Sequence, residues 1–223
     1  MSDARDEIGV AADFTAGKPG IVAECGASVG LSRNDHQQTC MTTQTGRPDP
    51  VAELRVPELH DASKIVGLVR DSGVLDVNSD YAYLLLCHHF ADTCLVAEVD
   101  DRIVGFTLGY RPPGRTDTLF LWQIGVSMTA RGEGLGSRML DELLRRHTKS
   151  GVQFLETTVT PSNSASQALF ESLARRKGVE CEVTPLFSSE MFSCAGAHEA
   201  EHLYRIGPLS DRTAGSGQMD DGS

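Results

Sequence analysis

The chain has 223 residues, 40% of them hydrophobic, with 31 acidic and 20 basic side chains and a formal net charge of -11. This charge excludes a general nucleic-acid binder, which needs a dominant basic surface to neutralise phosphates; an acidic excess mainly favours solubility. The sequence contains no run of about 18 apolar residues and its N-terminus is acidic, so we expect a cytoplasmic protein without a membrane span or secretory signal.

The first 50 residues have no sustained apolar period, and residues 1–50 are therefore predicted to be a disordered N-terminal extension. The single folded domain is predicted to span residues 51–208. The polar stretch 209–223 is predicted to be a disordered C-terminal tail. At about 155 residues, the domain is long enough to bury a substantial core.

The first half of the domain is predicted to contain a strand, two helices and a hairpin. "ELRVP" is a short strand, and "ELHDASKIVGLVRDSG" has the helical apolar period and ends at Gly73. "LDVNSDYAYLLLCHHF" combines a turn with a helix for which Ser79 is a candidate N-cap. "CLVAEVDDRIVGFTLGYRPP" contains two apolar runs joined by an Asp-Asp-Arg turn, which indicates a β-hairpin.

The second half is predicted to alternate strands and helices. "LFLWQIGV" and "VQFLETTVT" are strands, and "CEVTPLF" and "EHLYRIG" are the arms of a second hairpin. The helix 163–178 has Asn163 as its N-cap and Gly178 at its end. Another helix buries one stripe, formed by Leu135, Met139, Leu140, Leu143 and Leu144. This order predicts an α+β fold in which helices cover a mixed sheet.

The loop "RGEGLG", residues 131–136, places alternating glycines at the start of a helix. Glycines let the backbone approach a ligand, and the free amides of a first helical turn bind anions, most often phosphates. No Gly-Lys-Ser/Thr follows, so the loop is not a Walker A motif. It also lacks the spacing of a dinucleotide-binding βαβ unit.

The loop resembles the R/Q-x-x-G-x-G/A signature of the GNAT acetyltransferases, and "TVTPSNSASQALFESLARRKG" is similar to that family's fifth strand and the helix after it. The resemblance implies a central, mostly antiparallel mixed sheet flanked by helices, with acetyl-CoA as co-substrate and no metal. An amide near Val126 would then donate to the thioester oxygen as it becomes an oxyanion. The implied cofactor-binding residues are Ile124, Gly125, Val126, Arg131, Gly132, Glu133, Gly134, Leu135, Gly136 and Asn163.

Within that superfamily, residues 53–208 resemble the L-2,4-diaminobutyrate acetyltransferases of ectoine biosynthesis. The likeness rests on "LVRDSGVLDVNSDYAYLLLCHHFADTCLVAE", "VGFTLGYRPPGRTDTLFLWQIGV", "ARGEGLGSRML", "TVTPSNSASQALF" and "HEAEHLYRIGP". It implies acetyl transfer to the 4-amino group of L-2,4-diaminobutyrate by direct amine attack, in a cytoplasmic homodimer. Neither nucleic acid nor a membrane is an expected partner.

A diamino acid needs acidic groups for its ammonium groups, a donor for its carboxylate and an apolar wall. The family resemblance implies that Asp76 and Tyr81 bind the substrate. Trp122 lies on the strand expected to face the acetyl group, where its ring can screen the substrate and attract a cation. On pattern alone, Asp76 is equally suited to a turn or cap. Trp122 also fits a core position. Tyr83 fits either the core or the substrate site.

The segment "HEAEHLYRIG" supplies the candidate catalytic residues. Glu201 is predicted to bind the substrate amine or accept its proton, and His198 to hold the carboxylate or orient Glu201. Glu199 and His202 are close enough in sequence for the roles to be exchanged. The alternative is a solvated polar loop without a catalytic role.

Two departures from the superfamily leave other functions open. The strand "FLWQIGV" has no glutamate where many GNAT enzymes carry a catalytic one, and Phe170 stands where the thiolate's proton donor is often a tyrosine. The alternatives are therefore a GNAT enzyme for another small amine or a protein N-terminus, or a non-catalytic acetyl-CoA-binding module.

Overall fold

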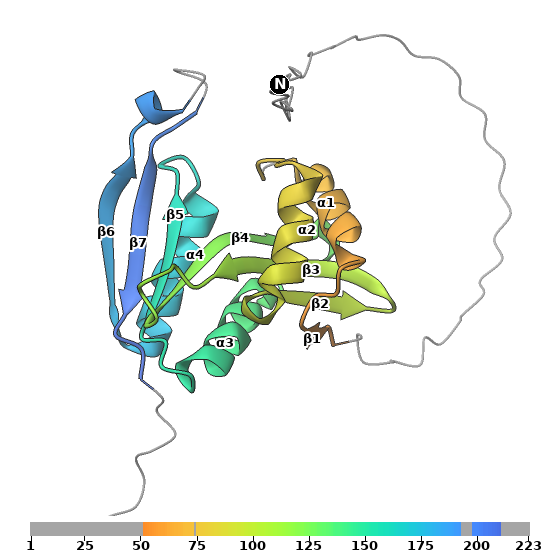
Figure 1. Cartoon of the computed structure of the whole chain (residues 1–223), viewed down its shortest axis with the longest axis horizontal. Helices are drawn as coiled ribbons and strands as arrows, with labels where there is room; N and C mark the ends of the chain where they lie inside the picture. The colour runs from red at the N-terminus through yellow and green to blue at the C-terminus, as the bar shows by residue number, and fades with distance from the viewer. Residues whose placement is uncertain (1–50, 74, 193–197, 211–223) are drawn as a thin grey trace, which may run out of the picture. The chain divides into compact units, whose positions relative to one another are not determined.

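The computed structural model describes residues 51–73, 75–192 and 198–210. The order of helices and strands agrees with the sequence prediction (Figure 1). The strands are β1 (Glu53–Arg55), β2 (Leu95–Val99), β3 (Arg102–Tyr110), β4 (Thr118–Val126), β5 (Phe154–Val159), β6 (Glu180–Phe187) and β7 (Glu201–Gly207). The helices are α1 (Asp61–Ser72), α2 (Asp80–His89), α3 (Leu135–Thr148) and α4 (Ser164–Lys177), with short 3-10 turns at Ala91–Thr93, Met128–Ala130 and Ser189–Met191.

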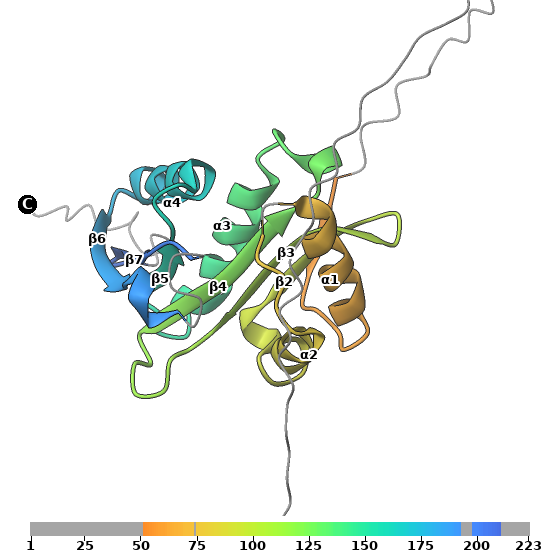
Figure 2. The same cartoon turned by 90° about the horizontal axis from the view of Figure 1, so that it is seen from above.

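The strands form one sheet in the order β1-β2-β3-β4-β5-β7-β6. Only β4 and β5 run parallel; all other neighbours are antiparallel. Helices α1 and α2 lie on one face of the sheet, and α3 and α4 lie on the other (Figure 2). The predicted α+β class, with a mixed and mostly antiparallel sheet flanked by helices, is confirmed.

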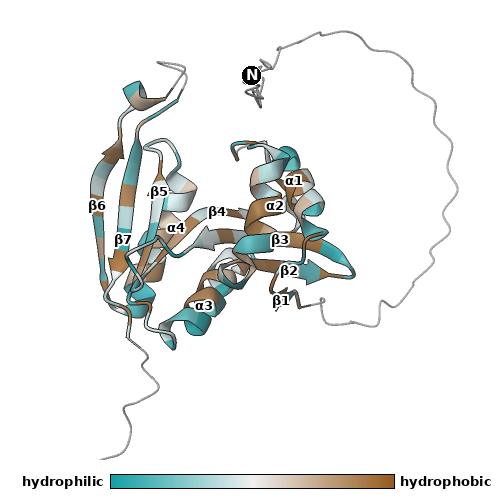
Figure 3. Cartoon of the chain, in the orientation of Figure 1, coloured by the Kyte–Doolittle hydropathy of each residue, from teal (hydrophilic) through white to brown (hydrophobic). Residues whose placement is uncertain are grey.

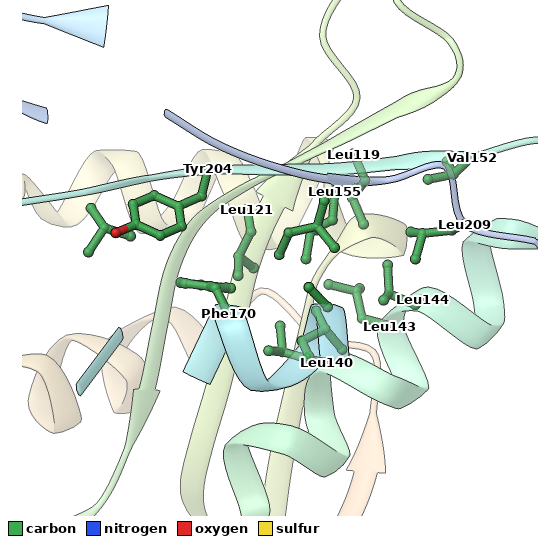
Figure 4. Packing of buried hydrophobic residues seen from close by; sticks show 14 of the residues in the cluster. Leu119, Leu121, Leu140, Leu143, Leu144, Val152, Leu155, Phe170, Tyr204 and Leu209 are labelled. Atoms are coloured by element: carbon green, nitrogen blue, oxygen red, sulfur yellow. The ribbon is translucent and has the colours of Figure 1, made fainter. Parts of the chain in front are cut away.

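Apolar side chains fill the space between the sheet and each helix layer. The central strands and α2 are largely hydrophobic, whereas the turn between β2 and β3 is hydrophilic (Figure 3). The stripe predicted for α3 is buried. Leu140, Leu143 and Leu144 pack with side chains from β4, β5, α4 and β7 (Figure 4), whereas Leu135 and Met139 belong to a second cluster with Ala52 and Ala97. Figure 4 labels Leu119, Leu121, Leu140, Leu143, Leu144, Val152, Leu155, Phe170, Tyr204 and Leu209 in this cluster.

Several local predictions are also confirmed. Gly73 and Gly178 end their helices in the left-handed conformation that favours glycine. The Asn163 carboxamide caps α4 by accepting from the Ser166 amide at 3.0 Å. Ser79 occupies the N-cap position of α2, but its side chain makes no capping hydrogen bond.

Strands β4 and β5 separate at their C-terminal ends. Their pairing covers only residues 118–121 of β4 against 154–157 of β5. Both strands continue past this point, to Val126 and Val159. The second half of β4 therefore has an edge without a strand neighbour, which leaves space for a ligand inside the fold.

The predicted N-terminal extension lies outside the described residues, as does most of the predicted C-terminal tail. Leu209, the first residue assigned to that tail, is buried, and its amide donates to the Gln153 carbonyl at 2.6 Å. The packed part of the domain therefore extends at least to Leu209. Among the described residues, no helix is both long and apolar enough to cross a membrane.

Candidate active site

The loop between β4 and α3 provides the predicted anion site. Gly132 and Gly134 have left-handed backbone angles, with φ of 86° and 74°, a conformation that strains residues with a side chain. Gly134 is also the N-cap of α3. The amides of the first helical turn have no acceptor within the helix, and together with the helix dipole they favour a phosphate at this point.

A cavity of about 590 Å³ lies between this loop, β4 and the start of α4. Five of the residues predicted to hold the cofactor line it: Ile124, Gly125, Val126, Arg131 and Asn163. Arg131 turns back over the end of β4, where its Nε donates to the Val126 carbonyl at 3.1 Å. The cavity connects the free strand edge with the glycine loop, as a cofactor with a long arm and a diphosphate requires.

Other residues of the loop take different positions. Glu133 and Leu135 line a separate cavity of about 390 Å³ beside Ala52. The Leu135 side chain is buried in the core, so this residue has only its backbone to offer a ligand. Gly136 lies within α3 at a backbone conformation open to any residue, and a Cβ there would make only ordinary contacts.

The free edge of β4 directs two amides into the space left by β5. The Ser127 amide donates to the Val104 carbonyl of β3 at 2.8 Å. Backbone amides alternate between the two sides of a strand, and the pairing of β4 with β3 is regular from Gln123 to Val126. The amides of Val126 and Ile124 therefore point away from β3, where they are available to polarise a carbonyl group.

A second cavity, of about 350 Å³, adjoins the first and shares Ile124 and Asn163 with it. Three carboxylates line the second cavity, those of Asp76, Glu199 and Glu201, and its one imidazole is that of His198. The structure thus brings together the catalytic pair and the acidic residue that the sequence predicted. This wall is chemically suited to cations rather than to phosphates.

Glu201 lies at the start of β7, with its side chain partly buried. Burial raises the pKa of the Glu201 carboxyl, whereas the Thr158 hydroxyl and the nearby His198 lower it. The carboxylates of Asp76 and Glu199 raise the pKa further. A carboxylate with a raised pKa is a better proton acceptor, so Glu201 has the chemistry expected of a general base.

His198 connects two walls of this cavity. Its Nε2 lies 3.7 Å from Oδ2 of Asp76, which belongs to the connection between α1 and α2. On the other side, Nδ1 lies 2.9 Å from the Glu199 carbonyl oxygen. The Phe192 ring stacks on the imidazole at 3.9 Å between centroids and an angle of 14°. These contacts fix the plane of the imidazole.

The two neighbours of the predicted pair, Glu199 and His202, have different surroundings, and the roles of Glu201 and His198 stay predictions. Glu199 lines the cavity, but its carboxylate accepts hydrogen bonds from both the amide and the hydroxyl of Ser162. His202 follows Glu201 in β7, so its side chain lies on the opposite face of the sheet. Glu201 lines the cavity, and its carboxyl has a raised pKa.

A register shift in β4 explains why the side chains of two consecutive residues, Trp122 and Gln123, both contact Tyr83 of α2. Leu121 lies opposite Gly109 and Gln123 lies opposite Leu108, so Trp122 has no partner on β3. Such an extra residue re-aims side chains that strict alternation would place on opposite faces. Both residues line the acidic cavity, as Ile124 does, and the sequence analysis missed Gln123.

The two tyrosines of α2 have different environments. Tyr83 is fully buried, and its ring lies 5.7 Å from that of Trp122. Tyr81 is 68% exposed and lies outside the residues that line the acidic cavity. The structure thus places Tyr83 in the core behind the cavity, and a substrate contact by Tyr81 stays a prediction.

Phe170 is buried within the core and also lines the acidic cavity. Its ring lies 6.5 Å from that of Tyr204 on β7. A phenylalanine has no proton to donate, so this position supplies an apolar wall. The sequence missed further lining residues, Asn78, Thr157 and Thr158, because no pattern distinguishes them from ordinary loop and strand positions.

Residues 62–174 match the model of the Acetyltransferase (GNAT) family. The chain therefore belongs to the GNAT acetyltransferase family, as the separated strands, the glycine loop and the adjoining acidic cavity indicate. Solved structures with low sequence identity share the fold: Ard1 from Thermoplasma volcanium is 15% identical with a TM-score of 0.56, covering 72% of this chain and 98% of that one.

Within this family, the chain is similar to the L-2,4-diaminobutyric acid acetyltransferases. It is 46% identical to that of Halalkalibacterium halodurans, over 72% of this chain and 84% of the relative. It is 48% identical to that of Nocardia farcinica, over 71% and 81%. The diaminobutyrate acetyltransferase of Paenibacillus lautus, solved with L-2,4-diaminobutyric acid and coenzyme A, is 42% identical with a TM-score of 0.68 and covers 71% of this chain and 96% of that one.

Proposed function

We propose that the protein transfers the acetyl group of acetyl-CoA to the 4-amino group of L-2,4-diaminobutyrate in ectoine biosynthesis. The observation that carries this proposal is the acidic cavity that adjoins the cleft beside the glycine loop. A relative that is 42% identical over nearly its whole length was solved with this diamino acid and coenzyme A. The same fold with an apolar second cavity would not support a diamine substrate.

The charges of the cavity complement those of the substrate. L-2,4-Diaminobutyrate has two amino groups and one carboxylate, and the wall offers the carboxylates of Asp76, Glu199 and Glu201 together with the imidazole of His198. We assign Asp76 to an ammonium group and His198 to the carboxylate. The face of Trp122 closes the apolar side and attracts a cation by about 0.5–2 kcal/mol.

The reaction needs a neutral amine and a polarised thioester. Glu201 accepts a proton from the 4-ammonium group, and the freed nitrogen attacks the acetyl carbonyl carbon. The amides of Val126 and Ile124 donate to the carbonyl oxygen as it gains negative charge, and one such donor lowers the barrier by about 2.7–4 kcal/mol in other enzymes. The C–S bond then breaks, CoA leaves as a thiolate, and the nitrogen releases its second proton to solvent to give the neutral amide. The thiolate takes its proton from solvent, because Phe170 has none to donate.

The test is a panel of amines with acetyl-CoA, read by thiol release and by NMR of the product. The proposal predicts turnover of L-2,4-diaminobutyrate with acetylation at the 4-amino nitrogen. Turnover of a different amine or of a protein N-terminus alone would assign another acetyltransferase activity. Thermal stabilisation by acetyl-CoA without thiol release from any amine would indicate a non-catalytic binding module.

We also propose that the protein is a cytoplasmic homodimer. The edge strand β6 supports an association between copies, because Val183, Leu186 and Phe187 are 45%, 40% and 44% exposed. Exposed apolar edge strands favour pairing with another chain. Light scattering on the purified protein should give twice the chain mass of 24.0 kDa, and a monomer at working concentration would refute the homodimer.

A further inference from the structure

Gln123 occupies the strand where many GNAT enzymes carry a glutamate, and the acetyl transfer described above gives it no role. Both ends of its carboxamide are engaged. Nε2 donates to the Asp76 carbonyl oxygen at 3.0 Å, and Oε1 accepts from the Tyr83 hydroxyl at 3.2 Å. Gln123 therefore connects a buried residue of α2 to the main chain of a proposed substrate-binding residue.

This pair of contacts explains the residue type at position 123. A carboxamide both donates and accepts, whereas an ionised carboxylate only accepts. A glutamate would leave the Asp76 carbonyl without this donor. It would also add a negative charge to a cavity that already contains three carboxylates. A glutamine can thus accept from the Tyr83 hydroxyl and donate to the Asp76 carbonyl without changing the charge of the cavity.

Tyr83 is held in place by the core, so its hydroxyl is a fixed hydrogen-bonding partner for Gln123. The side chain is fully buried and its ring packs against Trp122. Its hydroxyl also lies 3.5 Å from the Asp76 carbonyl oxygen and 3.5 Å from the Asn78 amide. Gln123 of β4 and Tyr83 of α2 thus both contact the main chain of residues 75–79, the connection between α1 and α2. We call this set of contacts the Tyr83–Gln123 bracket.

We propose that Tyr83 and Gln123 are positioning residues that fix the main chain at Asp76, and that the bracket sets the length of the diamino acid the enzyme prefers. The inference rests on the proposed function. The substrate has to reach from the Asp76 carboxylate to the thioester beside the Val126 amide. If the connection between α1 and α2 were free to move, a substrate longer by one methylene would fit nearly as well.

The first test needs no substrate. Tyr83→Phe removes only the hydroxyl and keeps the ring against Trp122. Hydrogen exchange measured by mass spectrometry should become faster in the peptide that covers residues 75–79, with β4 and α3 unchanged. Tyr110→Phe, at the far end of β3 and outside both cavities, is the matched control and should leave that peptide as in the wild type. Equal exchange in Tyr83→Phe and the wild type would overturn the bracket, whatever the enzyme acetylates.

The second test measures specificity. In Tyr83→Phe and in Gln123→Met, the KM for L-2,4-diaminobutyrate should rise about two- to tenfold, which is the range expected for a lost hydrogen bond. The KM for acetyl-CoA should not change. The preference for L-2,4-diaminobutyrate over L-ornithine, as a ratio of kcat/KM values, should fall at least about threefold.

An unchanged preference in both variants would overturn the length-setting role even if exchange near Asp76 is faster. An equal rise in both KM values would assign the two residues a general structural role instead. Absence of wild-type turnover on L-2,4-diaminobutyrate would refute the proposed function, and the exchange experiment would still decide the bracket.

Discussion

Replacement of Glu201 by glutamine tests the catalytic assignment. The change keeps the shape of the side chain and leaves the Thr158 hydroxyl a partner, because a carboxamide also accepts hydrogen bonds. General acid–base catalysis typically contributes about 10² to 10⁴ in rate. At about 1.36 kcal/mol per tenfold, this corresponds to about 2.7–5.4 kcal/mol of barrier. We expect kcat for L-2,4-diaminobutyrate to fall by that factor.

The pH dependence gives an independent reading of the same residue. The pKa of Glu201 is raised, so kcat/KM should fall on the acid side at a higher pH than for an ordinary carboxyl. Asp76 raises this pKa, so Asp76→Asn should move the acid side of the kcat/KM profile to lower pH. His198 lowers the pKa of Glu201, so His198→Gln should move the acid side of the profile to higher pH. In Glu201→Gln the fall of kcat/KM that comes from protonation of this carboxyl should disappear.

Thiol release at saturating acetyl-CoA measures kcat, and calorimetry measures the affinity for acetyl-CoA. Glu201 does not line the cofactor cleft, so that affinity should stay unchanged in Glu201→Gln. Glu180→Gln, on the exposed edge of β6, is the control and should behave as the wild type. A kcat in Glu201→Gln within tenfold of the wild type would falsify the assignment of the base.

Three further predictions concern the frame of the site. Gly134→Ala should weaken acetyl-CoA binding in calorimetry, because a side chain at φ of 74° costs about 1–2 kcal/mol, and a loop that relieves this strain moves the first amides of α3 from their place; an unchanged affinity would contradict this. Burial and the nearby Arg111 lower the pKa of His147 in the folded protein. As pH falls below 6.5, His147 therefore takes up a proton in the unfolded chain before it does so in the folded protein, and the free energy of unfolding decreases. Urea titrations at about pH 7.5 and 5.5 should show a smaller decrease for His147→Asn than for the wild type, and equal decreases would exclude the role of His147. Phe170→Ala should lower the free energy of unfolding by about 3–5 kcal/mol, since it empties a fully buried position; a loss below about 1 kcal/mol would show that the core refills the space.

Periodicity and local chemistry were sufficient to predict the helices, the strands and their order. The stripe of α3 repeats at helical spacing, so its burial followed from the sequence alone. Gly134 and Asn163 act through their own backbone and immediate neighbours, and their positions at helix starts were therefore readable. The family resemblance added residues that no local rule distinguishes, above all Asp76 and Glu201.

Tertiary structure alone decided how these residues work together. Asp76 lies in the connection between α1 and α2, whereas His198 and Glu201 lie together just before and at the start of β7; these two segments meet beside the gap where β4 and β5 separate. The register shift in β4 lets both Trp122 and Gln123 contact Tyr83, although strict alternation would place the two side chains on opposite faces of the sheet. The pKa of Glu201 depends on burial, on the Thr158 hydroxyl and on the charge of Asp76, which is distant in the chain, and these influences exist only after folding.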